Sequence, residues 1–288
     1  MFQRPFRSLL KFFDGLDGTK KVVFFVVIIL LCVVALFVAI YIEFFYQYSE
    51  TDPFFTGLVS SEKTQEEITN MKNGFNDLFK NSLTIEESQR DKVDSSIVQT
   101  GYQIQNNDDA FYTIQVNVPT IQLNTQTAVD LNAQLKNDFY QNALGYMVQT
   151  ERHIYYTVSY QAFYKDNYLS IVIKSSMKSG NDPESVIVKA YVYSIESDEL
   201  VSINEMLEHT GITSKKAQAA IDKEIKAANN RSKTLAVEFG EMYTRDVESE
   251  EYLVENAKNY FLTDEGNLYI VYTYGEDETT NEIDIIIL

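Results

Sequence analysis

The chain has few of the residues from which common catalytic and metal sites are built. Its 288 residues include one cysteine, two histidines, 11 glycines and no tryptophan. The cysteine, Cys32, lies within a long apolar run, so the rest of the chain has neither a disulfide nor a cysteine nucleophile. Neither His153 nor His209 is followed by another likely metal ligand three or four residues later, as in many zinc sites. No Gly-x-Ser-x-Gly elbow, Walker loop or dinucleotide glycine pattern occurs, so we expect no enzyme and no catalytic, cofactor-binding or metal site.

Three acidic groups are the remaining candidates for a Ca²⁺ site or a catalytic carboxylate pair. They are Asp108-Asp109, Glu196 with Asp198-Glu199, and Glu276-Asp277-Glu278. All three fall at predicted turns, where acidic side chains usually face water. We therefore expect them to be solvated, and the alternative of a carboxylate-dependent hydrolase would need Glu276 or Asp277.

Positive charge is scarce outside the N-terminus. Five of the 24 basic residues but only two of the 42 acidic residues precede position 22, and Glu43 follows the apolar run. Residues 44–288 therefore hold 19 basic and 39 acidic residues, a net charge of −20. Nucleic acid needs clustered Lys and Arg and is excluded as a partner, whereas a cationic protein would be attracted. The simpler interpretation of the acidic charge is solubility.

Residues 22–42 contain no charge and lie between Lys20-Lys21 and Glu43. As a helix this run would reach about 31 Å, enough to cross the hydrocarbon core of a bilayer. The excess of Lys and Arg before it predicts that residues 1–21 are a short cytoplasmic tail and that the C-terminal part is extracellular. A cleaved signal peptide is the main alternative, but its apolar core is usually shorter and ends at small residues. We expect a single-pass protein of the cell membrane, with the lipid bilayer contacted by residues 22–42.

Beyond the anchor, residues 43–96 are predicted to form a juxtamembrane stalk and a helix that is capped by Ser60 or Ser61 and runs to about residue 81. Alternation of apolar and polar residues then predicts strands at 113–118, 153–162, 169–173 and 186–195. In the second strand, Ile154, Tyr156, Val158, Tyr160 and Ala162 share one face, and His153, Thr157, Ser159 and Gln161 share the other. Short links between the last three strands imply antiparallel neighbours.

Helical spacing predicts helices at 125–149, 203–210, 214–229 and 249–260, the second of which ends at Gly211. The first helix has its apolar positions at Val129, Leu131, Leu135, Phe139 and Leu144. A turn at 264–267 separates strands at 260–262 and 268–274, and a last strand covers 282–288. This order predicts an α+β fold for residues 97–288, an antiparallel sheet with flanking helices.

Aromatic residues are abundant, with 20 Tyr and 18 Phe concentrated in 140–168 and 252–274. Tyrosines that alternate on a strand fill one face of a sheet and keep a hydrated hydroxyl. We expect most of them to serve the core and the sheet surface. The alternative is that exposed tyrosines bind protein or glycan.

Three segments carry a resemblance to a known family. They are VPTIQL at 118–123 with AVDLN at 128–132, LVSINEML at 200–207, and YFLTDEGNLYIVY at 260–272. Together they resemble the exported domain of lysozyme-responsive anti-sigma factors of the RsiV type, related to domains that precede some peptidoglycan deacetylase modules. The family often has a Gly-Gly-Ala-His turn where this chain has Ser179-Gly180-Asn181-Asp182. Residues 1–21 are also too short to hold a sigma factor, so the resemblance implies the fold and ligand binding but not sigma-factor sequestration.

The sequence thus predicts a membrane-anchored protein of the bacterial cell envelope with an RsiV-like domain at 97–288. We expect this domain to bind or sense an extracellular ligand, a cationic protein or a peptidoglycan-derived fragment, without catalysis. The alternatives are a scaffold in an envelope assembly and the carboxylate-dependent hydrolase.

Overall fold

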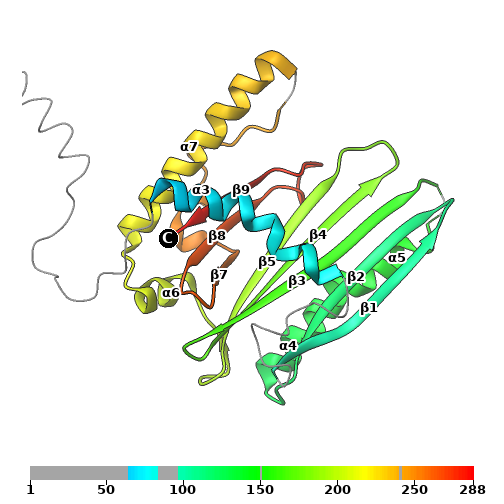
Figure 1. Ribbon diagram of the computed structural model, residues 1–288, viewed down its shortest axis with the longest axis horizontal. Coiled ribbons are helices and arrows are strands. Elements are labelled where there is room, and N and C mark those ends of the chain that lie inside the picture. The colour runs from blue at the N-terminus through cyan, green and yellow to red at the C-terminus, as the bar shows by residue number, and fades with distance from the viewer. Residues whose placement is uncertain (1–63, 84–96, 150, 240–241) are drawn as a thin grey trace, which may run out of the picture. The chain divides into compact units, whose positions relative to one another are not determined.

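The computed structural model describes residues 64–83, 97–149, 151–239 and 242–288 (Figure 1). The chain separates into two units, Met1–Glu62 and Lys63–Leu288, and the second unit contains all the described residues. No helix within the described ranges is both long and apolar enough to span a bilayer. The predicted tail, the run at 22–42 and most of the stalk lie outside the described residues, so these predictions stay predictions.

A six-stranded sheet with the strand order β1-β2-β3-β4-β5-β6 forms the larger half of this unit. Its strands are β1 (Val98–Asp108), β2 (Tyr112–Ile121), β3 (Ile154–Lys165), β4 (Tyr168–Ser179), β5 (Ser185–Ser194) and β6 (Glu199–Leu200). Neighbours are antiparallel as predicted, except that β2 and β3 are parallel. The exception arises because the chain returns between β2 and β3 through helices, which bring it back to the same end of the sheet. The purely antiparallel prediction was therefore wrong at this pair.

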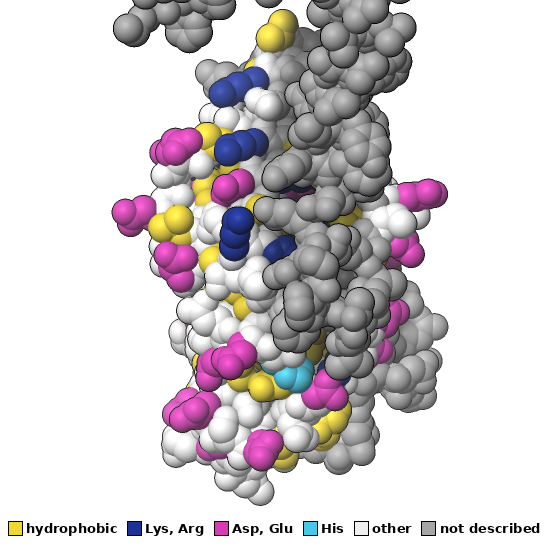
Figure 2. Space-filling model, turned by 90° about the vertical axis from the view of Figure 1, so that its left-hand side faces the viewer, with side chains coloured by type: hydrophobic (Ala, Val, Ile, Leu, Met, Phe, Trp, Pro, Cys, Tyr) yellow, Lys and Arg dark blue, Asp and Glu magenta, His cyan; other side chains and the backbone are white. Residues whose placement is uncertain are grey.

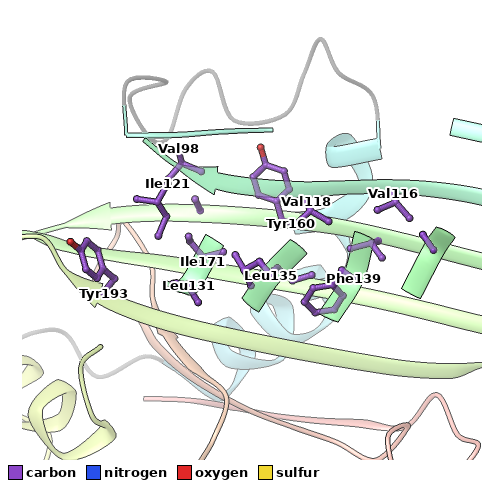
Figure 3. Close-up of a cluster of buried hydrophobic side chains, with 14 of the residues drawn as sticks. Val98, Val116, Val118, Ile121, Leu131, Leu135, Phe139, Tyr160, Ile171 and Tyr193 are labelled. Carbon is purple, nitrogen blue, oxygen red and sulfur yellow. The ribbon is translucent and has the colours of Figure 1, made fainter. Parts of the chain in front are cut away.

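The helices of that return cover one face of the sheet (Figure 1). They are α4 (Gln126–Leu135), the π-helical segment η2 (Lys136–Gln141) and α5 (Asn142–Tyr146). The predicted apolar face of β3, from Ile154 to Ala162, is buried beneath them together with Leu131, Leu135 and Phe139 (Figure 3).

Two predicted core positions of this helical segment were wrong. Val129 is 52% exposed and Leu144 is 38% exposed. The buried row consists instead of Ala128, Leu131, Leu135, Phe139 and Ala143, spaced by three and four residues. Val129 and Leu144 each directly follow a residue of this row, and one step along a helix turns a side chain about 100° away from the sheet.

A three-stranded antiparallel sheet covers the second face of β3, β4 and β5. It consists of β7 (Tyr260–Leu262), β8 (Leu268–Thr273) and β9 (Ile283–Ile287), in that order. Phe163 of β3 stacks on Phe261 of β7 at 5.7 Å between ring centroids, and Phe261 stacks on Tyr269 at 4.7 Å. The face of β3 that the sequence marked as polar is therefore partly an interface between two sheets.

The outer face of the small sheet packs against α6 (Ile203–Thr210) and α7 (Ser214–Phe239). Gly211 ends α6 with φ of 69°, as predicted. The predicted end of α7 at residue 229 was wrong by ten residues. Asn229 and Ser232 disfavour helix in isolation, but both are buried and hydrogen-bonded to Arg245, and these contacts stabilise the continued helix.

The predicted acidic helix at 249–260 was also wrong, because this segment forms two short 3₁₀ turns, η3 (Glu250–Tyr252) and η4 (Val254–Asn256). The side chain of Gln218 on α7 donates to the carbonyl of Tyr252 at 2.9 Å and accepts from the amide of Val254 at 2.8 Å. In a continuous helix, the carbonyl of Tyr252 and the amide of Val254 would form hydrogen bonds within the helix, but here both bond to Gln218.

The N-terminal helix α3 (Gln65–Gly74) is followed by the 3₁₀ segment η1 (Phe75–Leu83). Thr64 caps α3 in a capping box with Glu67, so the predicted cap at Ser60 or Ser61 was wrong. Phe75 and Phe79 of η1 pack with Phe163, Val172 and the small sheet, which places η1 beside the second face of the large sheet.

Candidate functional site

The second face of the large sheet changes from apolar to polar along its strands. Where the small sheet covers it, cross-strand neighbours such as Val172 and Ala190 are buried. Two residues after Val172 on β4, Lys174 lies opposite Ser159 of β3. Two residues further along β4, Ser176 lies opposite Thr157 of β3. The sheet-to-sheet interface therefore opens into a polar region at one end.

This region is a pocket of about 440 Å³ between the sheet, η1 and the segment that leads into β9. A volume of this size is within the range of small-molecule sites. The described residues that line it are Asn76, Phe79, Thr157, Ser159, Lys174, Ser176, Glu184, Val186, Asn281 and Ile283.

Lys174 is the cationic group among these residues. Its ammonium donates to Asn76 Oδ1 at 2.6 Å and lies 5.9 Å from the centroid of the Phe79 ring. Burial lowers the pKa of Lys174, and the charge of Glu184 offsets part of this shift. The ammonium is thus partly desolvated and held at the pocket wall by a neutral acceptor.

Ser176, Glu184 and Ser159 are further polar residues of the pocket lining. The Ser176 hydroxyl donates to the Glu184 carboxylate, which is exposed at the mouth of the pocket. Ser159 is 7% exposed and also lines the pocket. A serine hydroxyl in a pocket lining can donate a hydrogen bond to a ligand.

The three predicted acidic groups lie at separate turns and are largely exposed. Asp108 accepts from the amide of Ala110, Asp109 accepts from Asn107, and Glu276 pairs with Lys189 at 2.9 Å. No cluster of three or more metal-binding side chains occurs within the described ranges.

Asp198 lies in the turn after β5, where its side chain accepts a hydrogen bond. It has φ of 55° and accepts from the hydroxyl of Tyr193 at 2.8 Å. Hydrogen bonds from Thr125 and Tyr193 lower its pKa. This carboxylate therefore stabilises a turn beside the helical crossover.

The two histidines also lie apart from each other and from the pocket. His153 Nε2 is 3.2 Å from the hydroxyl of Thr113, and its ring lies 4.4 Å from that of Tyr155. His209 is 3.6 Å from Asp166, and its ring lies 4.6 Å from that of Tyr168. Each makes local contacts at the side of the sheet.

Most predicted tyrosine positions serve the core. Tyr156, Tyr160, Tyr193 and Tyr274 are buried, whereas Tyr155 is 49% exposed. In Figure 2, Lys and Arg side chains gather in the upper half of the view, and acidic side chains lie along its edges and over its lower end.

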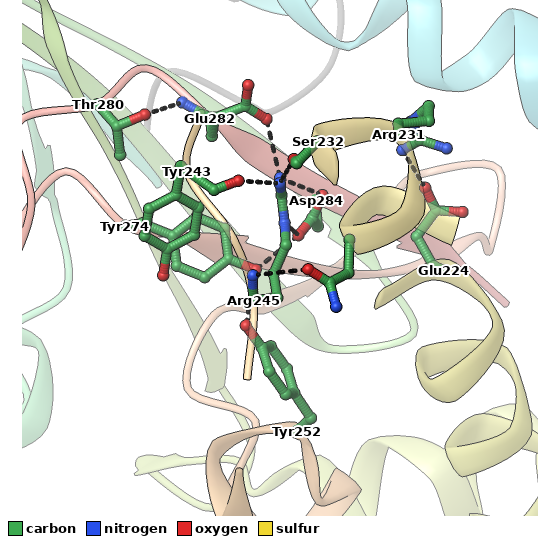
Figure 4. Close-up of polar contacts among 11 residues, drawn as sticks. Glu224, Arg231, Ser232, Tyr243, Arg245, Tyr252, Tyr274, Thr280, Glu282 and Asp284 are labelled. Atoms are coloured by element: carbon green, nitrogen blue, oxygen red, sulfur yellow. Dashed lines mark hydrogen bonds and ion pairs between the residues drawn. The ribbon is translucent and has the colours of Figure 1, made fainter. Parts of the chain in front are cut away.

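A buried ion network around Arg245 was not predicted from the sequence (Figure 4). The guanidinium donates to both carboxylate oxygens of Asp284 at 2.8 and 3.0 Å and to Glu282 at 2.8 Å. It also donates to Ser232 at 2.6 Å, so it joins α7 to β9. With 4% of Arg245 exposed, the network is a structural support and has no open face for a ligand.

The pocket was not predicted from the sequence either, although the sequence does show the polar residues that the two strands contribute to it. Thr157, Ser159, Lys174 and Ser176 are polar at alternate positions of two neighbouring strands. Their pattern alone is the same as that of a solvated sheet face. The walls come from residues 76–79 and 281–283, far away along the chain.

Comparison with known proteins finds likeness only at the level of solved structures. No family model matches the chain, and no curated protein does. One similar structure is a protein from Pseudomonas aeruginosa PAO1, with 10% identity and a TM-score of 0.38 over 66% of this chain and 87% of that one. Another is from Bacteroides fragilis NCTC 9343, with 10% identity and a TM-score of 0.36 over 66% of this chain and 89% of that one. Both are DUF3298 family proteins.

Proposed function

We propose that this chain is a single-pass membrane protein of the bacterial cell envelope whose exported domain, of the RsiV-like type, binds a ligand without catalysis. The pocket on the second face of the large sheet is the observation that carries this proposal. It combines a charged group, several hydroxyls and amides, and an aromatic wall in one concave site. The uncharged run at 22–42 and the basic residues before it support the anchored, N-in arrangement.

Among the ligands considered, the pocket favours a small envelope-derived molecule such as a peptidoglycan fragment. A folded cationic protein is too large for about 440 Å³ and would meet the ammonium of Lys174 inside the pocket. It would have to bind elsewhere, on the acidic surface. The net charge of −20 beyond residue 43 supports that second candidate.

The test uses the full chain in lipid nanodiscs and soluble peptidoglycan fragments, with binding followed by calorimetry. Thr157→Trp places a large ring over the pocket floor and should weaken binding about tenfold or more, a change of about 1.4 kcal/mol or greater. The matched control is Tyr155→Trp, at an exposed position of the same strand that does not line the pocket.

Each result decides between the candidates. Binding that Thr157→Trp weakens and Tyr155→Trp leaves unchanged supports the pocket. Salt-sensitive binding of a basic lysozyme that neither substitution affects would favour the acidic surface. Absence of both kinds of binding would refute ligand binding and favour the scaffold alternative.

A further inference from the structure

The inner charge of the pocket has no ion-pair partner in the described part of the chain. Lys174 donates to Asn76, a neutral acceptor, and no described carboxylate lies within ion-pair distance of its ammonium. An ammonium has three donors, so two remain for other contacts. Desolvating a charge without pairing it is unfavourable, and an anionic ligand would recover that loss.

A second donor lies beside this ammonium. Ser159 is directly opposite Lys174 on the neighbouring strand, where side chains on one face are about 5 Å apart. Ser159 is 7% exposed and lines the pocket with Lys174. An ammonium and a hydroxyl at this spacing can donate to the two oxygens of one carboxylate.

The rest of the lining is neutral and amphipathic. Asn76, Thr157 and Asn281 supply amide and hydroxyl groups, and Phe79 supplies an aromatic ring. Such groups suit a ligand with several hydroxyls and an apolar ring face. Glu184, the acidic group of the lining, is exposed and accepts from Ser176, and its charge offsets only part of the effect of burial on the pKa of Lys174.

We propose that the pocket selects a small hydroxylated ligand that bears one carboxylate, of the acidic-sugar class, and that Lys174 and Ser159 bind the carboxylate. This inference rests on the proposed ligand-binding function and deepens it. A phosphate is less suited to the site, because phosphate sites commonly use arginines or clustered backbone amides. Among the described lining residues there is one lysine and no arginine.

The test compares N-acetylglucosamine with N-acetylmuramic acid, which is the same sugar with a carboxylate-bearing lactyl ether at O3. With the full chain in nanodiscs, the acidic sugar should bind about tenfold tighter or better, the size expected for a charge-assisted hydrogen bond. Lys174→Met should abolish this preference, so that both sugars bind with equal affinity. Lys178→Met is the control, because Lys178 is an exposed lysine of the same strand outside the pocket.

Ser159→Ala provides a second variant that keeps the charge and the fold. It should reduce the affinity for the acidic sugar about fivefold, as expected for one lost hydrogen bond. Equal binding of both sugars by the unsubstituted protein overturns the inference, as does a preference that survives Lys174→Met. Tighter binding of a phosphorylated N-acetylglucosamine overturns it as well.

Failure of this inference and failure of the proposed function give different results. If both sugars bind equally and Thr157→Trp weakens both, the pocket still binds ligands and the carboxylate requirement alone is refuted. If neither the sugars nor peptidoglycan fragments bind, both proposals are refuted.

Discussion

Replacing Arg245 by methionine should lower the free energy of unfolding by about 3–5 kcal/mol, because it removes one partner of a buried ion pair. The side chain of Arg245 is 1% exposed and that of Asp284 is 2% exposed. Methionine keeps much of the apolar stem of arginine. The change therefore removes the charge and the donors more than it removes packing.

The magnitude follows from what the substitution leaves behind. Asp284 would lose both guanidinium bonds and keep the hydroxyl of Tyr274, at 2.6 Å, as its hydrogen-bond donor. The hydroxyl of Ser232 would lose its donor in the same buried region. Glu282 is 33% exposed and can turn to water, so it adds little to the cost.

Urea unfolding of the full chain, followed by far-ultraviolet circular dichroism, measures this loss. The double variant Arg245→Met with Asp284→Leu is the informative control, because replacing a buried ion pair by apolar groups is often close to neutral. We expect the double variant to regain most of the stability that the single variant loses. A single-variant loss below about 1 kcal/mol, or a double variant no more stable than the single one, would refute the reasoning.

Two further predictions concern packing and pH. A methyl group at Gly275 would collide with the backbone of β5, so Gly275→Ala should lower the free energy of unfolding by about 1–3 kcal/mol. Gly145 lies in a helix with open space around it, so Gly145→Ala should raise the free energy of unfolding by about 0.5–1 kcal/mol. Equal effects of the two substitutions in urea unfolding would contradict this contrast. Burial, together with the charge of Glu205, raises the pKa of Tyr260 to about 12. The folded state keeps this tyrosine neutral while the unfolded state ionises near pH 10, so the stability it contributes is present below about pH 10 and is lost as the pH rises through about 12. A Tyr260→Phe variant that loses as much stability between pH 10 and pH 12 as the unsubstituted protein would contradict this prediction.

The helix-covered face of the large sheet could be predicted from local pattern. Ile154, Tyr156, Val158, Tyr160 and Ala162 alternate with polar residues, and all five are buried. The prediction succeeds because successive side chains of a strand must point to opposite faces, and helices α4 and α5 cover the apolar one.

Element ends and register within helices were predicted less well. The helical segment after β2 was found, but Val129 and Leu144 were placed in its core, because several apolar stripes fit the same segment. The ends of α7 and the turns after residue 249 depend on Arg245 and Gln218, whose partners lie elsewhere in the sequence. Local propensity does not contain these contacts.

The second face of the large sheet shows most clearly what local sequence pattern cannot predict. Thr157 and Ser159 marked it as polar, and both do line a polar pocket. Phe163 on the same face is buried against Phe261, nearly a hundred positions later in the chain. Whether a polar strand face meets water, another sheet or a ligand depends on which distant segment packs there.

By itself the sequence determined the α+β class and the strand periodicity, because these follow from spacings of two to four residues. It also determined the absence of a disulfide scaffold in the acidic part of the chain, because this follows from composition. The tertiary structure alone decided that Lys174 and Ser159 face a pocket and that Arg245 is buried with Asp284. Those relations join residues that are 15 to 39 positions apart. Only the folded chain brings such groups into contact, because packing and desolvation act through space and not along the sequence.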